Sequence, residues 1–214
     1  MSDVKRSFVP AAGHDWFLPF YDPMLWLLGG SAAKQQLIEQ AELQPEQRVV
    51  DIGCGTGDLT VLIKQRHPDV EVIGLDPDLK ALARARHKLD RAGLSAQLDR
   101  GFSDELPYED ASLDCVFSSF MFHHLGSEEK AKTLSEIRRV LRPSGRLHLL
   151  DFGGSTERRD HGLIARLLHS GDHMRDNLEG RIPGLMTEAG LADAGETAHR
   201  RTVFGRIAYY RASA

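Results

Sequence analysis

Three glycines at alternate positions follow a run of β-branched residues early in the chain. Residues 49–59 read VVDIGCGTGDL, and Gly53, Gly55 and Gly57 lie in the second half of this stretch. Valine and isoleucine favour a buried strand, and glycines directly after a strand allow a tight turn and a close approach of the backbone to a ligand. Apolar residues at helical spacing follow over residues 58–68. The stretch therefore predicts a strand, a ligand-binding glycine turn and a helix.

Alternating strand and helix patterns continue along the chain. Such alternation implies parallel strands joined by right-handed helical crossovers. Residues 196–213 differ, because two strand-like runs separated near Gly205 are typical of an antiparallel hairpin. We predict an α/β fold, with a Rossmann-like, mostly parallel sheet flanked by helices and a C-terminal antiparallel hairpin on the sheet edge. The predicted strands are 48–53, 70–76, 113–119 and 146–153, and the predicted helices are 31–43, 58–68, 77–93, 127–145 and about 160–177.

Composition and charge exclude several classes of protein. The chain has 214 residues, of which 41% are hydrophobic and 27% charged, with a formal net charge of -4. This describes one ordinary globular domain without the basic excess that nucleic-acid binding demands, so nucleic acid is not expected as a partner. Cys54 and Cys115 are too few for a disulfide framework and fit the reducing cytoplasm. We expect no membrane association, because no segment has the apolar length of a membrane helix and the first residues lack a signal-peptide core.

The spacing of the glycines and the nearby acidic residues narrow the class of ligand that the loop can bind. A dinucleotide fingerprint, G-x-G-x-x-G, needs a glycine at position 58, where the chain has Asp58, and this argues against a nicotinamide cofactor. Asp51 and Asp58 flank the loop and suit a cationic ligand better than a pyrophosphate. Asp76 stands about 20 positions after the last glycine, where a carboxylate can accept both ribose hydroxyls. The alternative role of Asp76 is to cap a helix that begins at Pro77. An adenosine-containing ligand is predicted.

These motifs resemble those of a known family. VVDIGCGTGDL resembles the first motif of the class I S-adenosylmethionine-dependent methyltransferases, and VIGLDPD (residues 72–78) resembles their second-strand acidic motif. The stretches LPYEDASLDCVFSSFMFHHL, EIRRVLRPSGRLHLLDF and LMTEAGL are similar to the branch that includes small-molecule and quinone-biosynthesis C-methyltransferases. The resemblance runs from about Ala33 to the C-terminus. It implies a single methyltransferase domain over residues 1–214, with an N-terminal lid segment (1–32), a cofactor-binding core (33–153) and a substrate-side helix with terminal strands (154–214).

The resemblance also implies which residues bind S-adenosyl-L-methionine, with S-adenosyl-L-homocysteine as the product. The glycine loop would line the methionine part, Asp76 would take the ribose and Pro77 would flank the adenine. The family has an aspartate for the adenine amino group where this chain has Phe102, so apolar cover by Phe102, the backbone amide of Ser103 and a contact from Asp104 all stay open. The expected cofactor-binding residues are Asp51, Gly53, Cys54, Gly55, Thr56, Gly57, Asp76, Pro77, Phe102, Ser103 and Ser118.

The expected reaction is an in-line transfer of the methyl group to a small-molecule acceptor. Alignment of the reacting atoms supplies much of the acceleration, so a dedicated catalytic residue is not required. His123 and His124 follow the fourth strand and are candidates for a general base, with packing as the alternative role. Trp16, Tyr21 and His124 are the expected substrate or lid residues. His169 and His173 share a helix face but lack a further ligand, so no metal site is expected. A noncatalytic cofactor-binding protein of the same fold is the alternative function.

Overall fold

The structure, a computed structural model, describes residues 30–154, 172–202 and 205–214. The predicted lid residues Trp16 and Tyr21, and most of the helix predicted near residues 160–177, lie outside the described residues. Among the described helices, none has the length and apolar character needed to cross a bilayer. The elements are α2 (Gly30–Ala41), β1 (Arg48–Ile52), α3 (Asp58–Arg66), β2 (Glu71–Asp76), α4 (Leu79–Arg91), β3 (Gln97–Arg100), β4 (Leu113–Ser119), η1 (Phe122–His124), α5 (Ser127–Val140), β5 (Leu141–Phe152), η2 (Asp172–Met174), α7 (Arg175–Leu178), α8 (Ile182–Glu188), β6 (Ala192–Thr202) and β7 (Gly205–Ser213).

Seven strands form one sheet in the order β3-β2-β1-β4-β5-β7-β6. The first five strands along the chain pair in parallel, whereas β7 pairs antiparallel with both β5 and β6. This confirms the predicted mostly parallel sheet with an antiparallel hairpin at its edge. The strand order reverses between β1 and β4, so the carboxyl ends of these two strands mark the crevice in which open α/β sheets bind ligands.

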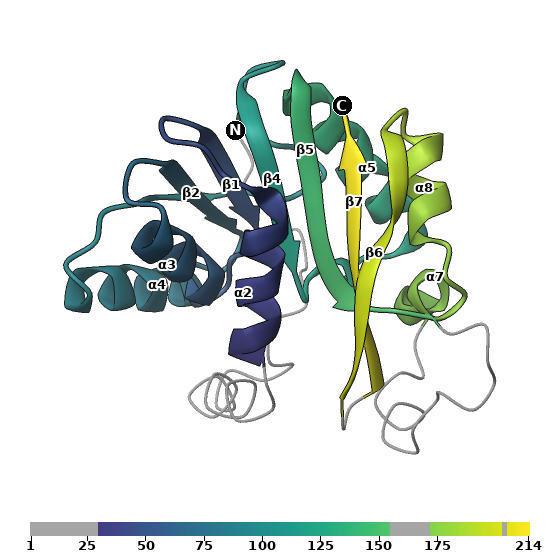
Figure 1. The fold of residues 1–214 in the computed structure, drawn as a ribbon, viewed down its shortest axis with the longest axis horizontal. Coiled ribbons are helices and arrows are strands. Elements are labelled where there is room, and N and C mark those ends of the chain that lie inside the picture. Colours follow the sequence, from purple (N-terminus) through teal and green to yellow (C-terminus); the bar gives the residue numbers. More distant parts are fainter. Residues whose placement is uncertain (1–29, 155–171, 203–204) are drawn as a thin grey trace, which may run out of the picture.

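Helices cover both faces of the sheet (Figure 1). Helices α2, α3 and α4 lie on one face, where Leu37 and Ile63 pack against Val49. Helices α5 and α8 lie on the other face, where Leu134 packs with Val50. Because the strands are buried from both sides, they read as continuous apolar runs, as parallel strands do.

The boundary between α5 and β5 differs from the prediction. The helix expected to extend to Gly145 ends at Val140, and β5 already begins at Leu141. Pro143 is the physical reason, because proline lacks the amide hydrogen that a helix needs and disfavours helical backbone at Arg142 before it. The short elements β3 and α8 have four and seven residues, too few for a clear periodic pattern.

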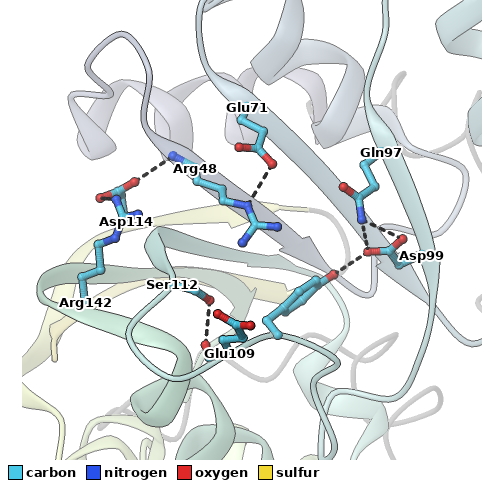
Figure 2. Close-up of polar contacts among 9 residues, drawn as sticks. Arg48, Glu71, Gln97, Asp99, Glu109, Ser112, Asp114 and Arg142 are labelled. Carbon is cyan, nitrogen blue, oxygen red and sulfur yellow. Dashed lines mark hydrogen bonds and ion pairs between the residues drawn. The ribbon is translucent and has the colours of Figure 1, made fainter.

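Polar contacts join the strands at their amino ends, opposite the candidate site (Figure 2). Arg48, at the start of β1, donates through Nε to Glu71, at the start of β2. Its backbone N–H donates to Asp114, near the start of β4, and Asp114 also pairs with Arg142 of β5. On β3, Gln97 donates to Asp99. These contacts tie the amino ends together and leave the carboxyl ends of the strands free to form a site.

Candidate active site

A cavity of about 710 Å³ opens at the carboxyl ends of the strands. Its size is within the roughly 300–1,000 Å³ typical of small-molecule sites. The lining comes from the loops after β1, β2, β3 and β4 and from the start of α5. The lining residues are Gly53, Gly55, Leu75, Asp76, Pro77, Asp78, Gly101, Phe102, Ser103, Asp104, Phe120, Met121, His124, Leu125, Glu128, Glu129, Lys132 and His173.

The glycine loop is fastened to the end of β2 and open toward the cavity. The backbone N–H groups of Gly53 and Cys54 donate to the carbonyl of Leu75 at 2.8 and 3.0 Å. Gly55 has a left-handed φ of 54°, and a Cβ added there would meet no atom within 4 Å. Gly57 serves packing instead, because a Cβ at this position would lie 2.7 Å from the Cβ of Ala85 on α4. The three glycines therefore have different structural roles.

Asp76 links the end of β2 to the glycine loop. Its Oδ2 accepts a hydrogen bond from the backbone N–H of Gly55 at 2.9 Å, and its Oδ1 accepts one from the N–H of Asp78 at 2.9 Å. Burial raises the pKa of the Asp76 carboxyl despite these two hydrogen bonds. Helix α4 begins at Leu79 and is capped by the side chain of Asp78, which accepts from the N–H of Lys80 at 2.8 Å. Asp76 is therefore not the residue that caps this helix.

Asp51 is a buried carboxyl group at the end of β1. The hydroxyl of Thr60 donates to its Oδ2 at 2.8 Å, whereas its Oδ1 has no hydrogen-bond partner among the described residues. Burial raises the pKa of Asp51 to about 7, although the Thr60 hydrogen bond and the charge of Lys34 oppose the shift. A buried acceptor without a donor is costly, so this oxygen suits a ligand that brings a positive donor.

Asp58 does not share that role. It pairs with Lys34 at 3.4 Å and with Lys88 at 2.5 Å. Although burial opposes the change, the two lysines lower the pKa of Asp58. The argument that both Asp51 and Asp58 would attract a cationic ligand is therefore wrong for Asp58, because lysines from α2 and α4 already neutralise it.

The loop after β3 forms another part of the cavity wall. Phe102 and Asp104 line the cavity beside Ser103. The hydroxyl of Ser103 lies 2.9 Å from that of Thr133 on α5, which fixes the loop against the helix. Phe102, Ser103 and Asp104 all line the cavity, so the three possible adenine contacts stay open.

His123 and His124 lie together on η1, but their surroundings differ. The Nδ1 atom of His123 lies 2.7 Å from Oδ1 of Asp151, which is fully buried at the end of β5. His124 lines the cavity, and its ring centroid lies 4.0 Å from that of His123. Burial, reinforced by the charge of His123, lowers the pKa of His124 to about 4.

Comparison with known proteins agrees with this geometry. A protein-family profile described as a methyltransferase domain matches residues 49–145. The demethylmenaquinone methyltransferase of Thermus thermophilus is 36% identical over 137 residues, which make up 63% of this chain and 61% of that protein. Residues 49–145 of this chain are therefore similar to methyltransferase domains.

Solved structures show the same fold as this chain. The YcgJ protein of Bacillus subtilis superposes with a TM-score of 0.71 at 18% identity, covering 85% of this chain and 97% of that one. Phosphoethanolamine N-methyltransferase 2 of Haemonchus contortus, solved in complex with S-adenosyl-L-methionine, superposes with a TM-score of 0.70 at 16% identity, covering 87% of this chain and 53% of that one. At these identities the likeness shows the fold alone. The match to the Thermus protein spans about three fifths of its length.

The cavity brings together only part of the predicted site. Gly53, Gly55, Asp76, Pro77, Phe102, Ser103 and His124 line it. Six other predicted residues are described but are not among its lining residues: Asp51, Cys54, Thr56, Gly57, Ser118 and His123. The hydroxyl of Ser118 is buried without a described hydrogen-bond partner, and Thr56 accepts from Lys88 at 2.8 Å. The binding roles of all these residues stay predictions.

Several residues that line the cavity were not predicted. Phe120 and Met121 directly follow β4, so their position after a strand was an available signal. Glu128, Glu129 and Lys132 reach the cavity from α5, which depends on how α5 packs, and no local pattern indicates it.

His173 lines the cavity, and a buried lysine anchors its segment. Lys130 of α5 is fully buried and donates to the carbonyl of His173 at 2.5 Å. It also donates to Asn177 at 3.0 Å and pairs with Asp176 at 3.5 Å. Asn177 in turn donates to the carbonyl of Phe152 at 3.1 Å. Among the described residues no cluster of three potential metal ligands occurs, so His173 has no described metal-binding partners.

Proposed function

We propose that this chain is an S-adenosylmethionine-dependent methyltransferase that acts on a small aromatic acceptor, with a demethylmenaquinone-like hydroquinone as the leading candidate. The observation that carries the proposal is the pairing of Asp76 with Gly55 at the edge of the cavity. A carboxylate at the end of β2, next to a loop glycine that leaves open space, is the arrangement with which this fold class receives a nucleoside.

The cofactor fits the residues that are present. Asp76 would accept the ribose hydroxyls, and the free Oδ1 of Asp51 would accept the ammonium group. Gly55 would allow the close approach of the amino-acid part, and Pro77 and Phe102 would flank the adenine. Three features of the structure support these assignments. A Cβ at Gly55 would meet open space, Oδ1 of Asp51 is buried without a described hydrogen-bond partner, and the carboxylate of Asp76 can accept further hydrogen bonds.

Once bound, S-adenosylmethionine supplies an activated methyl group on a positively charged sulfur. The work of the protein is then to align the acceptor and to exclude water. Phe120, Met121 and Leu125 give the cavity an apolar wall beside His124, which favours an aromatic acceptor over a charged one. The name of the Thermus relative supports a hydroquinone. Both described thiols are free, which favours a cytoplasmic location.

The presence of Phe102 where the family has an aspartate favours one second candidate, a noncatalytic cofactor-binding protein. The two are separated by incubating the chain with methyl-labelled S-adenosylmethionine and a reduced 2-prenyl-1,4-naphthoquinone under anaerobic conditions. The proposal expects one labelled methyl group in the extracted product and equimolar S-adenosylhomocysteine. Binding of S-adenosylhomocysteine without labelled product, over a panel of hydroxyl, amine and thiol acceptors, would support the noncatalytic candidate.

A further inference from the structure

The pairing of His123 with Asp151 holds one imidazole in a defined state. Asp151 is fully buried at the carboxyl end of β5, and His123 lies on η1 directly after β4. Nδ1 of His123 is 2.7 Å from Oδ1 of Asp151, and the backbone N–H of His123 donates to Oδ2 at 3.1 Å. The N–H of Phe152 donates to Oδ1 at 2.7 Å. The ring and the backbone of His123 are therefore fixed by the same carboxylate.

This hydrogen-bond pattern defines the tautomer. Oδ1 of Asp151 accepts from Phe152 and also faces Nδ1, as an ionised carboxylate oxygen can. The proton of the neutral imidazole then lies on Nδ1, and Nε2 keeps its lone pair. Among the described residues, Asp151 is the only hydrogen-bond partner of the His123 ring. No described residue forms a hydrogen bond with Nε2, and 13% of the His123 side chain remains exposed.

Two phenylalanine rings pack in series between this imidazole and the cavity. The ring of His123 packs edge-on against Phe152 at 4.9 Å between centroids, and Phe152 packs edge-on against Phe120 at 5.8 Å. Phe120 lines the cavity, as does His124, whose ring is tilted by 40° against that of His123. Phe120 has a left-handed φ of 54°, a conformation that is costly for a bulky residue and that concentrates at functional sites.

We propose that His123 is the general base of the methyltransferase and that Asp151 is its positioning residue. This inference rests on the proposed function. The hydroxyl O–H bond of the acceptor breaks, its electron pair stays on oxygen, and the proton bonds to Nε2 of His123. The resulting imidazolium is stabilised by the Asp151 carboxylate and later releases the proton to water. The acceptor is consequently a molecule with an acidic hydroxyl, such as a phenol or a hydroquinone.

The surroundings distinguish His123 from His124. No carboxylate of the described residues pairs with His124, and burial lowers its pKa to about 4, which makes it a weak base near neutral pH. Other groups that act electrostatically on these two histidines or on Asp151 are His173 of η2, Lys130 of α5 and Tyr210 of β7. Within the described part of the chain, Asp151 is the carboxylate that contacts the ring of His123.

Nuclear magnetic resonance of the full chain labelled with 15N-histidine tests the geometry without any acceptor. His123, identified by comparison with His123→Gln, is expected as the neutral Nδ1–H tautomer, and Asp151→Asn is expected to shift it toward the Nε2–H tautomer. An Nε2–H tautomer of His123 in the unsubstituted protein would overturn the inference. Where His123→Gln fails to fold, His123 is identified instead through the coupling of its ring to its own sequentially assigned backbone signals.

The pH dependence of kcat with reduced 2-prenyl-1,4-naphthoquinone tests the chemistry. His123→Gln is expected to lower kcat by about 10²–10⁴-fold, the usual contribution of a general base, with S-adenosylhomocysteine affinity unchanged. The rate of the His123→Gln variant should rise with pH, because the acceptor then ionises without a general base. Asp151→Asn should lower kcat and move the acidic limb of the profile. The control is His199→Gln, because His199 forms an exposed pair with Glu196 at 3.0 Å, far along β6, and should leave the profile unchanged.

The outcomes separate this inference from the proposed function. An unchanged pH profile in His123→Gln would overturn the role of His123. A chain that binds S-adenosylhomocysteine but methylates only amines or thiols, or no hydroxyl acceptor, would also overturn it. A chain that binds no S-adenosylhomocysteine would contradict the proposed function itself, whereas the tautomer of His123 would still be read independently.

Discussion

The backbone N–H of Gly55 donates to Oδ2 of Asp76 across 2.9 Å, which joins the loop after β1 to the end of β2. Together with the bonds from Gly53 and Cys54 to the carbonyl of Leu75, this contact fixes the glycine loop beside the carboxylate of Asp76. The free acceptor capacity of Asp76 then points to a ligand with hydroxyl donors.

Asp76→Asn should weaken the binding of S-adenosylhomocysteine. The substitution removes the charge from hydrogen bonds that are worth about 1.5–3 kcal/mol each, so we expect the dissociation constant to rise at least tenfold. Isothermal titration calorimetry measures the change. Asp90→Asn, on the exposed side of α4, is the matched control and should bind like the unsubstituted chain. Equal affinity of both variants would refute the ribose-binding role.

Gly55→Ala should lower both stability and ligand affinity, whereas Gly93→Ala should lower stability alone. Both glycines have left-handed φ, 54° and 65°, and at neither would a Cβ meet an atom within 4 Å. Each alanine should therefore cost about 1–2 kcal/mol of unfolding free energy. Only Gly55 lines the cavity, so only its methyl group would occupy ligand space. Chemical denaturation and calorimetry with S-adenosylhomocysteine measure the two effects, and equal affinities would contradict the location of the site.

The strand–loop–helix units were predictable because they are local. The β-branched run before Gly53 indicates β1, and the same segment supplies the loop and the start of α3. The neutralisation of Asp58 was not predictable, since Lys34 and Lys88 come from α2 and α4. The carboxylate that holds His123 was also hidden, because Asp151 lies 28 residues further on. Local patterns indicate elements, whereas the charge state of a site depends on contacts between distant elements.

Asp51→Asn should change how stability depends on pH. The pKa of Asp51 is raised from 3.8 to about 7 in the folded chain, so the folded state holds a proton that the unfolded state has released. Stability from this group is full below pH 3.8 and is lost as the pH rises to about 7, by at most about 1.4 kcal/mol per unit. Asparagine does not ionise, so the Asp51→Asn variant loses no stability in this way. Denaturation at several pH values should therefore show a stability advantage of Asp51→Asn that grows up to about pH 7; a constant difference would contradict the raised pKa.

The same residue should make ligand affinity depend on pH. Ionised Asp51 attracts an ammonium group and neutral Asp51 does not, so the affinity of the unsubstituted chain for S-adenosylhomocysteine should rise from pH 5.5 to pH 8 around a pKa of about 7. Asp51→Asn should bind more weakly at pH 8 and lack this rise. Calorimetry at both pH values is the measurement, and parallel pH profiles for the two proteins would exclude contact between Asp51 and the ammonium group.

At position 120, glycine should destabilise the chain less than alanine does, which is the reverse of the usual order. Glycine ordinarily destabilises a chain by about 0.5–1 kcal/mol relative to alanine, but a left-handed backbone costs a residue with a Cβ about 1–2 kcal/mol. Since Phe120 has a φ of 54°, Phe120→Gly should be the more stable of the two variants. Glu71, in the extended backbone of β2, is the control and should show the usual order. Thermal denaturation of the four variants decides the point; the usual order at Phe120 would argue against strain there.

The most direct test of the central claim is a calorimetric titration of the full chain with S-adenosylhomocysteine, repeated with NADH. The geometry of Gly55, Asp76 and Asp51 predicts saturable binding of one S-adenosylhomocysteine per chain, displaced by S-adenosylmethionine, and no binding of NADH. Binding of NADH in place of S-adenosylhomocysteine, or no binding of either, would contradict the account.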